Sequence, residues 1–136
     1  MLLDKLIVDI KQLYPAVTLQ KSNVYGYDSD NKIIFYKRGS NELLTVISIL
    51  HELGHHVVHT SNHNYEVSTP TEMQCKIIEI EVMAWVYGRS MLNQFQLNTP
   101  EIDRYYTTVQ AKFINSYIKA LQNKKCVKSI YLSYDN

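Results

Sequence analysis

The chain has 136 residues and a formal net charge of +1, and 46% of its residues are hydrophobic while 20% are charged. This balance predicts a single folded domain over residues 1–136 and excludes an intrinsically disordered chain. Because the charge is near neutral and the sequence carries no nucleic-acid-reading motif, we expect no nucleic-acid partner.

The cysteine usage and the hydropathy pattern point to the compartment. Cys75 and Cys126 are far apart and form no CxxC pattern, which argues against a disulfide scaffold. Charges at Asp4 and Lys5 interrupt any signal-peptide core, and the apolar stretch 43–50 is too short to span a bilayer. We therefore expect a cytoplasmic protein without a membrane partner.

Apolar residues at helical spacing predict four helices. Pro15 closes the first, and a capping box at 69–72 opens the third, with Pro70 at its first position. The expected ranges are 2–13, 42–59, 70–91 and 100–121. On the third helix the expected inward stripe is Met73, Ile77, Ile80, Ala84, Tyr87 and Met91.

The segment between the first two helices favours β-structure. Two β-prone runs, 24–27 and 32–36, flank the turn-forming residues 28–31, which predicts a hairpin with a four-residue turn. A weaker strand is expected around 18–20. The fold class is therefore α+β, mainly helical, with a small antiparallel sheet before the second helix.

The second helix contains the motif His51-Glu52-Leu53-Gly54-His55, which is HExxH. Residues four apart on a helix face the same way, so both imidazoles can reach one metal ion. Glu52 lies beside this stripe, where it can contact an activated water without binding the metal itself. A helix with ordinary solvated histidines does not explain why His51 interrupts the apolar run 43–53. The motif predicts one Zn²⁺ per chain, with Glu52 as the catalytic base.

A hydrolytic zinc site takes a third protein ligand. His59 and His63 follow the motif, but histidines on successive turns of one straight helix cannot easily surround an ion. A carboxylate of the third helix has better geometry. At about 100° per residue, Glu81 falls roughly 80° from the centre of the apolar stripe and Glu79 roughly 120° away on the other side. This favours Glu81, while His59, His63 and Glu79 stay open.

The motif and the segment 81–88, Glu-Val-Met-Ala-Trp-Val-Tyr-Gly, resemble the ImmA/IrrE zinc metallopeptidases. That family shows HE(L/I)xH followed by E-x-x-A-x-x-F-A, and the wider gluzincin group shares the motif plus a downstream Glu. The resemblance covers roughly residues 1–95 and implies a zincin-like domain. Tyr87-Gly88 replaces the family's Phe-Ala, and Trp85 stands where a polar residue is common. The zinc ligands that the resemblance implies are His51, His55 and Glu81.

The resemblance implies a zinc endopeptidase of narrow specificity that cleaves a regulatory protein, such as a transcriptional repressor, in stress response or in phage or mobile-element biology. The alternative is a non-catalytic zinc-binding module that sequesters a regulator or defence protein, although a structural site would not need Glu52. We expect substrate to add as a strand at a sheet edge formed by 32–36, and His56 to be exposed. Candidates for holding the oxyanion or the substrate are His59, His63, Tyr65, Tyr105 and Tyr106.

Overall fold

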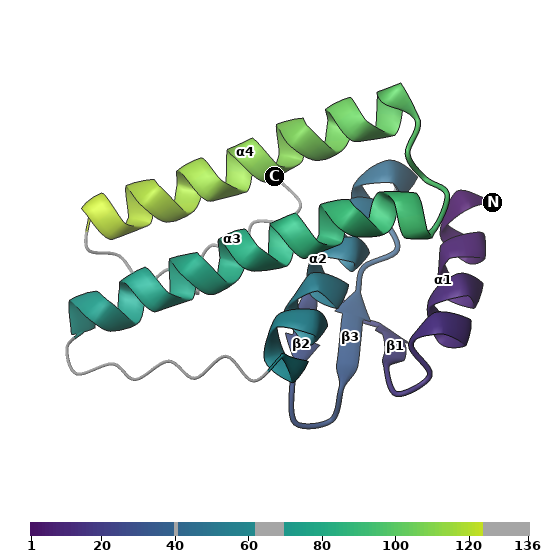
Figure 1. Cartoon of the computed structure of the whole chain (residues 1–136), viewed down its shortest axis with the longest axis horizontal. Coiled ribbons are helices and arrows are strands. Elements are labelled where there is room, and N and C mark those ends of the chain that lie inside the picture. Colours follow the sequence, from purple (N-terminus) through teal and green to yellow (C-terminus); the bar gives the residue numbers. More distant parts are fainter. Residues whose placement is uncertain (40, 62–69, 124–136) are drawn as a thin grey trace.

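The computed structural model describes residues 1–39, 41–61 and 70–123 (Figure 1). These residues confirm the mainly helical α+β class, and the four expected helices and the expected hairpin all form. In chain order the elements are α1 (Leu2–Leu13), β1 (Thr18–Lys21), β2 (Gly26–Asp28), β3 (Ile33–Tyr36), α2 (Glu42–Thr60), α3 (Pro70–Gln94) and α4 (Pro100–Gln122).

The three strands form one sheet in the order β1-β3-β2, so β3 is its central strand. β2 and β3 make the expected antiparallel hairpin, in which Gly26 pairs with Phe35. β1 instead pairs in parallel with β3, so the sheet is mixed and not wholly antiparallel as expected. The expectation that 32–36 is an edge open to a peptide is wrong, because β1 and β2 lie on both sides of it.

Side-chain hydrogen bonds explain how the chain turns and how α2 begins. In the hairpin, the Asp28 carboxylate accepts hydrogen bonds from the backbone N–H groups of Asp30 at 3.0 Å and Asn31 at 3.2 Å, which reverses the chain. At the start of α2, the Asn41 side chain accepts from the backbone N–H of Leu44 at 3.1 Å. This cap satisfies one of the backbone donors that a helix leaves unpaired at its N-terminus.

The long helices α3 and α4 begin at prolines and lie side by side in antiparallel orientation (Figure 1). The Thr99 hydroxyl caps α4 by accepting from the backbone N–H of Ile102 at 3.2 Å. α3 begins at Pro70 as predicted, but the expected capping residue Thr69 lies outside the described residues.

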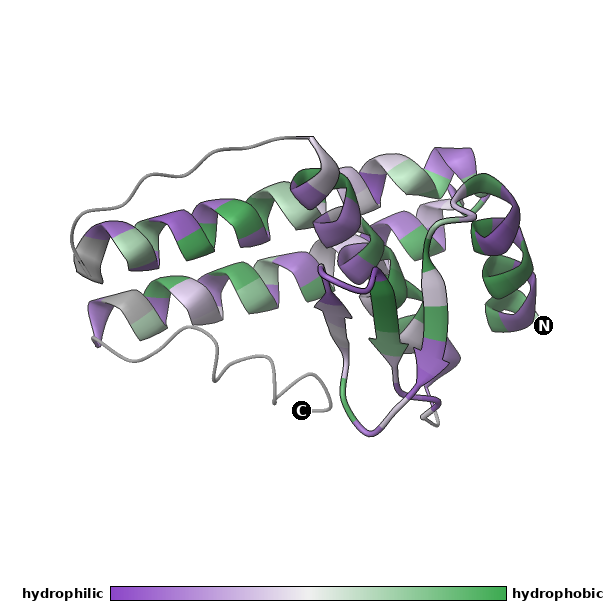
Figure 2. Ribbon diagram, turned by 90° about the horizontal axis from the view of Figure 1, so that it is seen from below, coloured by the Kyte–Doolittle hydropathy of each residue, from purple (hydrophilic) through white to green (hydrophobic). Residues whose placement is uncertain are grey.

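The helix that carries HExxH is the most buried element of the fold. α2 contacts α1, β2 and β3 as well as α3, so neighbours cover most of its circumference. The apolar side chains of Val46, Ile47, Leu50 and Leu53 are completely buried, as expected for a helix that is apolar nearly all round. The hydrophobic strand β3, with fully buried Ile34, faces this core (Figure 2). The metal-binding motif is therefore built into the core of the protein.

The buried face of α3 differs from the expected stripe. Met73, expected to point inward, is 47% exposed, and Tyr87 is only partly buried. Trp85 and Gly88 were not part of the expected stripe but are buried, because α2 and α4 both pack closely against this part of α3. The buried residues of α3 are Glu81, Ala84, Trp85, Gly88, Met91 and Leu92.

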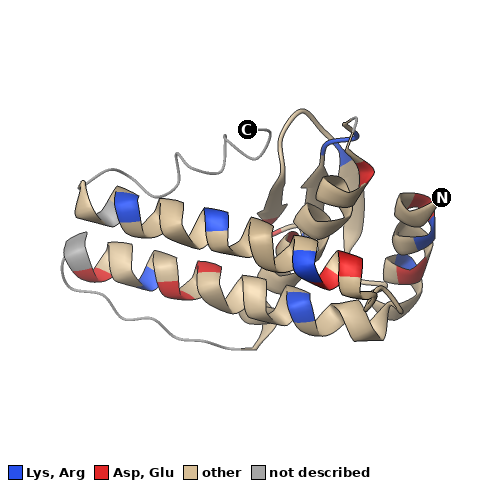
Figure 3. Ribbon diagram, turned by 90° about the horizontal axis from the view of Figure 1, so that it is seen from above, with Lys and Arg blue, Asp and Glu red and all other residues tan. Residues whose placement is uncertain are grey.

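The surface charge and the helix hydropathy bear on the partners expected for the protein. Basic and acidic residues are interspersed along α3, whereas on α4 the acidic residues lie in the first turn and the later charged residues are basic (Figure 3). Among the described residues, each helix is either too short or too polar to cross a membrane.

Candidate metal centre

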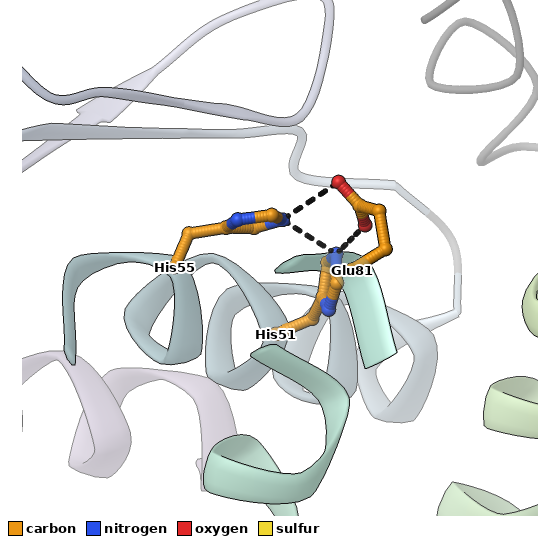
Figure 4. A group of neighbouring side chains, drawn as sticks. All are labelled: His51, His55 and Glu81. Carbon is orange, nitrogen blue, oxygen red and sulfur yellow. Dashed lines mark hydrogen bonds and ion pairs between the residues drawn. The ribbon is translucent and has the colours of Figure 1, made fainter. Parts of the chain in front are cut away.

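The two histidines of the motif meet at their outer ring nitrogens. His51 and His55 lie one turn apart on α2, and their Nε2 atoms are 3.1 Å apart (Figure 4). His51 is completely buried, whereas the side chain of His55 is 12% exposed. One histidine is thus enclosed in the core, while the other borders solvent.

Glu81 on α3 completes the group, as the sequence predicted. Its Oε2 atom lies 3.0 Å from Nε2 of His51, and its Oε1 atom lies 3.0 Å from Nε2 of His55 (Figure 4). The Glu81 side chain is only 1% exposed. Within the described part of the chain, these three side chains form a group whose ligand atoms are close enough together to bind one metal ion.

The donor set and its spacing fit a zinc ion. Zinc–nitrogen and zinc–oxygen bonds of about 2.0–2.2 Å in a tetrahedron place neighbouring donor atoms about 3.3–3.6 Å apart. The two Nε2 atoms are 3.1 Å apart, and each lies 3.0 Å from a different oxygen of Glu81, a few tenths of an ångström below that value. A small outward movement therefore makes room for the ion. Two histidines and one glutamate are also the ligands of hydrolytic zinc sites, which leave a fourth position for water.

The protonation states of two of the three side chains, His51 and Glu81, suit metal binding. Burial lowers the pKa of His51 to about 4, so this imidazole is neutral at neutral pH. Burial acts to raise the pKa of Glu81, but the charge of His55 and hydrogen bonds with both histidines outweigh it and lower that pKa to about 2. Burial acts to lower the pKa of His55, but the charge of the Glu81 carboxylate and its hydrogen bond outweigh burial and raise that pKa. An ionised carboxylate and a neutral imidazole are therefore in place.

Glu52 lies beside this group without belonging to it. Its side chain is 1% exposed, and its Oε1 atom is 3.9 Å from Nε2 of His51. A second buried carboxylate thus stands next to the position where the two histidines converge. This is the placement that the motif predicts for a general base, which must reach a water at the site and not the metal itself.

Glu79, His59 and His63 were the other possible third ligands. Glu79 is 50% exposed and pairs with Lys76 at 3.2 Å on the surface of α3. His59 is exposed near the C-terminal end of α2. His63 lies outside the described residues. The structure thus brings Glu81 to the motif histidines and leaves Glu79 and His59 at the surface.

Two of the tyrosines considered as helpers for the oxyanion or the substrate have other partners. The Tyr105 hydroxyl accepts a hydrogen bond from the Asn41 side chain at 3.0 Å. The Tyr106 hydroxyl is buried and donates to the backbone carbonyl of Trp85. Tyr65 lies outside the described residues. These contacts hold Tyr105 and Tyr106 in the packing between α4 and its neighbours.

His56 is not exposed, contrary to the expectation. It is 7% exposed, and its Nδ1 atom is 2.6 Å from the Tyr27 hydroxyl on β2. Tyr14 also contacts the His56 ring edge-on, with the ring centroids 6.2 Å apart. Because α2 is covered on the sheet side as well as on the α3 side, its histidine next to the motif is buried against the sheet. His56 therefore ties α2 to β2.

Two aromatic contacts to the site were not predicted. The sole tryptophan, Trp85, stacks on the His51 ring with centroids 4.1 Å apart and an interplanar angle of 25°. It also stacks on Phe113 of α4 at 5.9 Å. Tyr117 of α4 is buried, and its hydroxyl donates a hydrogen bond to Oε2 of Glu81 at 3.0 Å. Tyr117 stands at helical spacing from Tyr106 and Phe113, which are also buried, but nothing in this spacing connects it to Glu81.

No protein-family model matches this chain, and neither the curated proteins nor the solved structures include one with significant similarity to it. The resemblance to the ImmA/IrrE metallopeptidases therefore depends on the motif residues and their spacing. The evidence for a metal centre is the convergence of two imidazoles and a carboxylate from α2 and α3.

Proposed function

We propose that this protein is a zinc-dependent endopeptidase of narrow specificity, which cleaves a regulatory protein such as a transcriptional repressor. The observation that carries the proposal is the convergence of His51, His55 and Glu81, with the Glu52 carboxylate buried beside them. A structural metal site has no use for an additional buried carboxylate of this kind, whereas hydrolysis of a peptide bond needs a base.

Each residue has a distinct role in the proposed reaction. His51, His55 and Glu81 would hold the ion, which when bound lowers the pKa of a water and polarises the peptide carbonyl. Glu52 accepts the proton of the attacking water and then delivers it to the amine that leaves when the peptide bond breaks. Trp85 stacks on His51 and keeps its ring from rotating away from the other two donors.

The resemblance to the ImmA/IrrE metallopeptidases supports a protein substrate with a regulatory role, in stress response or in phage or mobile-element biology. A cytoplasmic location fits this substrate class. It also fits the exposed free thiol of Cys75, since a reducing compartment keeps such a group unoxidised.

The test combines metal content with cleavage. Elemental analysis of the wild type is expected to find one zinc per chain. The protein is then incubated with purified repressors and with a peptide library, and products are identified by mass spectrometry. Glu52→Gln is expected to keep its zinc and to cleave about 10²–10⁴-fold more slowly than the wild type, the usual contribution of a general base.

The possible outcomes distinguish the endopeptidase from the non-catalytic zinc-binding module. A Glu52→Gln variant that cleaves as fast as the wild type would refute the proposed mechanism. A zinc-loaded wild type that binds a regulator tightly and leaves it intact would support the non-catalytic, sequestering module instead. A wild type that binds no zinc, even when zinc is supplied, would exclude both functions.

A further inference from the structure

The Glu81 carboxylate is in contact with α4 as well as with α2. Its Oε2 atom is 3.0 Å from Nε2 of His51 and also accepts the hydrogen bond of the Tyr117 hydroxyl at 3.0 Å. Tyr117 is 1% exposed, so water does not compete for this hydrogen bond. One oxygen of the proposed metal ligand is thus contacted from two sides, by side chains of two different helices.

The Glu81 side chain needs a contact of this kind to be held in one orientation. A glutamate side chain has three rotatable bonds, and ordering it costs conformational entropy. Both carboxylate oxygens of Glu81 face the histidines, Oε2 toward His51 and Oε1 toward His55. A hydrogen bond to one oxygen from outside the donor group selects this orientation before any ion is bound. Side chains that contact a metal ligand, but not the metal itself, orient that ligand and tune the affinity for the metal.

In the contact between Tyr117 and Glu81 the hydroxyl donates and the carboxylate accepts. Burial, and after it the negative charge of Glu81, raise the pKa of Tyr117 far above its usual value. This shift favours the protonated hydroxyl, which donates to Oε2 of Glu81 at 3.0 Å in a buried environment. The donor and acceptor roles in this pair are unambiguous.

We propose that Tyr117 is a positioning residue of the metal centre: its hydroxyl, brought in by α4, holds the Glu81 carboxylate so that both oxygens face His51 and His55. This inference rests on the proposed zinc site. It makes α4 a part of the site, although α4 itself supplies no metal ligand. Loss of the hydroxyl leaves all three ligands in the chain but removes the contact that aligns one of them.

Tyr106 offers a matched control on the same helix. It is buried to the same degree as Tyr117, and its hydroxyl also donates a buried hydrogen bond. Its acceptor is the backbone carbonyl of Trp85 and not a ligand side chain. Replacing either tyrosine by phenylalanine removes one buried hydroxyl from α4. Any difference in zinc affinity between the two variants therefore reports on the contact with Glu81.

The experiment measures zinc dissociation constants by competition with a chelating indicator. Tyr117→Phe is expected to bind zinc 10–100-fold more weakly than the wild type, and Tyr106→Phe as tightly as the wild type. If Tyr117 acts through Glu81, then Tyr117→Phe introduced into Glu81→Ala causes no further loss. Equal affinity of Tyr117→Phe and the wild type, or the same loss with and without Glu81, would overturn the inference.

A measurement on the unmodified protein keeps the inference testable even if Tyr117→Phe does not fold. With tyrosines labelled at the ring carbon that bears the hydroxyl, the Tyr117 resonance is expected to shift on zinc binding while the Tyr106 resonance does not. A Tyr117 resonance that is unchanged at saturating zinc would overturn the inference. Absence of zinc binding by the wild type is a different result, because it removes the proposed function as well.

Discussion

Gly54 on α2 packs directly against the backbone carbonyl of Ala84 on α3. A Cβ atom at position 54 would overlap that carbonyl oxygen and would lie only 2.8 Å from the carbonyl carbon. Gly54 stands between His51 and His55 in the motif, and Ala84 lies one turn after Glu81. The backbones of the two helices are therefore in contact beside the candidate metal ligands, and the missing side chain is what lets the carboxylate reach the imidazoles.

Gly54→Ala is expected to destabilise the protein and to weaken zinc binding. Its Cβ meets backbone atoms, which cannot swing aside, so the cost lies at the upper end of the roughly 1–3 kcal/mol typical of overpacking. The better helix propensity of Ala, ~1 kcal/mol, does not offset it. Urea unfolding and zinc titration measure the two effects.

Gly26→Ala is the control for this substitution, because a Cβ at position 26 has nothing within 4 Å. Its unfolding free energy and zinc affinity are expected to match the wild type. A Gly54→Ala protein as stable as Gly26→Ala would show that α2 and α3 can separate without cost.

Glu81→Ala is expected to lower zinc affinity strongly, because two imidazoles remain where three donors converged. Glu79→Ala is the matched control: it removes the same side chain from the same helix, but from a position that is 50% exposed and paired with Lys76. Elemental analysis after dialysis against a weak chelator compares the two variants. Full zinc content in Glu81→Ala, or loss in Glu79→Ala, would contradict the assignment of Glu81 as the third ligand.

Trp85 provides a built-in reporter of metal binding. It is the sole tryptophan of the chain, and its ring stacks on the His51 imidazole at 4.1 Å. Cobalt(II) on His51 would therefore lie close enough to quench the indole, since its partly filled d shell accepts excitation energy. The intrinsic fluorescence is expected to fall until one equivalent of cobalt has been added.

His51→Ala should abolish this cobalt response, whereas His56→Asn should retain it, because His56 contacts Tyr27 and not Trp85. Quenching that persists in His51→Ala would place the metal elsewhere.

The stability of the zinc-free protein is expected to fall as the pH drops from about 6.5 to about 4. The pKa of His51 is about 4 in the folded protein and 6.5 as the reference value, so the unfolded chain takes up this proton first and acid favours unfolding. The effect is on the order of 3 kcal/mol across this window. His55 does not oppose it there, because its raised pKa acts above pH 6.5.

Urea unfolding at several pH values, with zinc removed, gives the slope of the unfolding free energy against pH. His51→Asn lacks the titrating group and should show a shallower slope between pH 4 and 6.5. An identical slope in the two proteins would mean that His51 is not the group responsible.

Local signals in the sequence were sufficient to predict the helices, the hairpin and the two histidines of the motif. The helix starts at Pro70 and Pro100 and the turn at Asp28 depend on bonds and steric limits within a few residues, so they can be predicted without tertiary structure. The same is true of His51 and His55, because residues four apart share a face of any helix. The tertiary fold was not needed to bring these two imidazoles together.

The register of α3 was harder to predict. Glu81 was expected at the edge of an apolar stripe and lies within the buried face, while Met73 was expected inward and is exposed. A stripe inferred from apolar residues overlooks Gly88, whose missing side chain allows close packing against Leu50 and Tyr106. It also counts Met73 near the N-terminal end of α3, where the side chain is exposed.

The sequence by itself determined the helices, the hairpin and the pair of imidazoles with Glu52 beside them, because each follows from contacts within one element or one turn. Only the tertiary structure decided that β3 is central, that Glu81 and not Glu79 meets the histidines, and that Tyr117 holds Glu81. These relationships join elements far apart in the chain. They depend on how closely and in what rotation the elements pack, which hydropathy spacing within a single element does not encode.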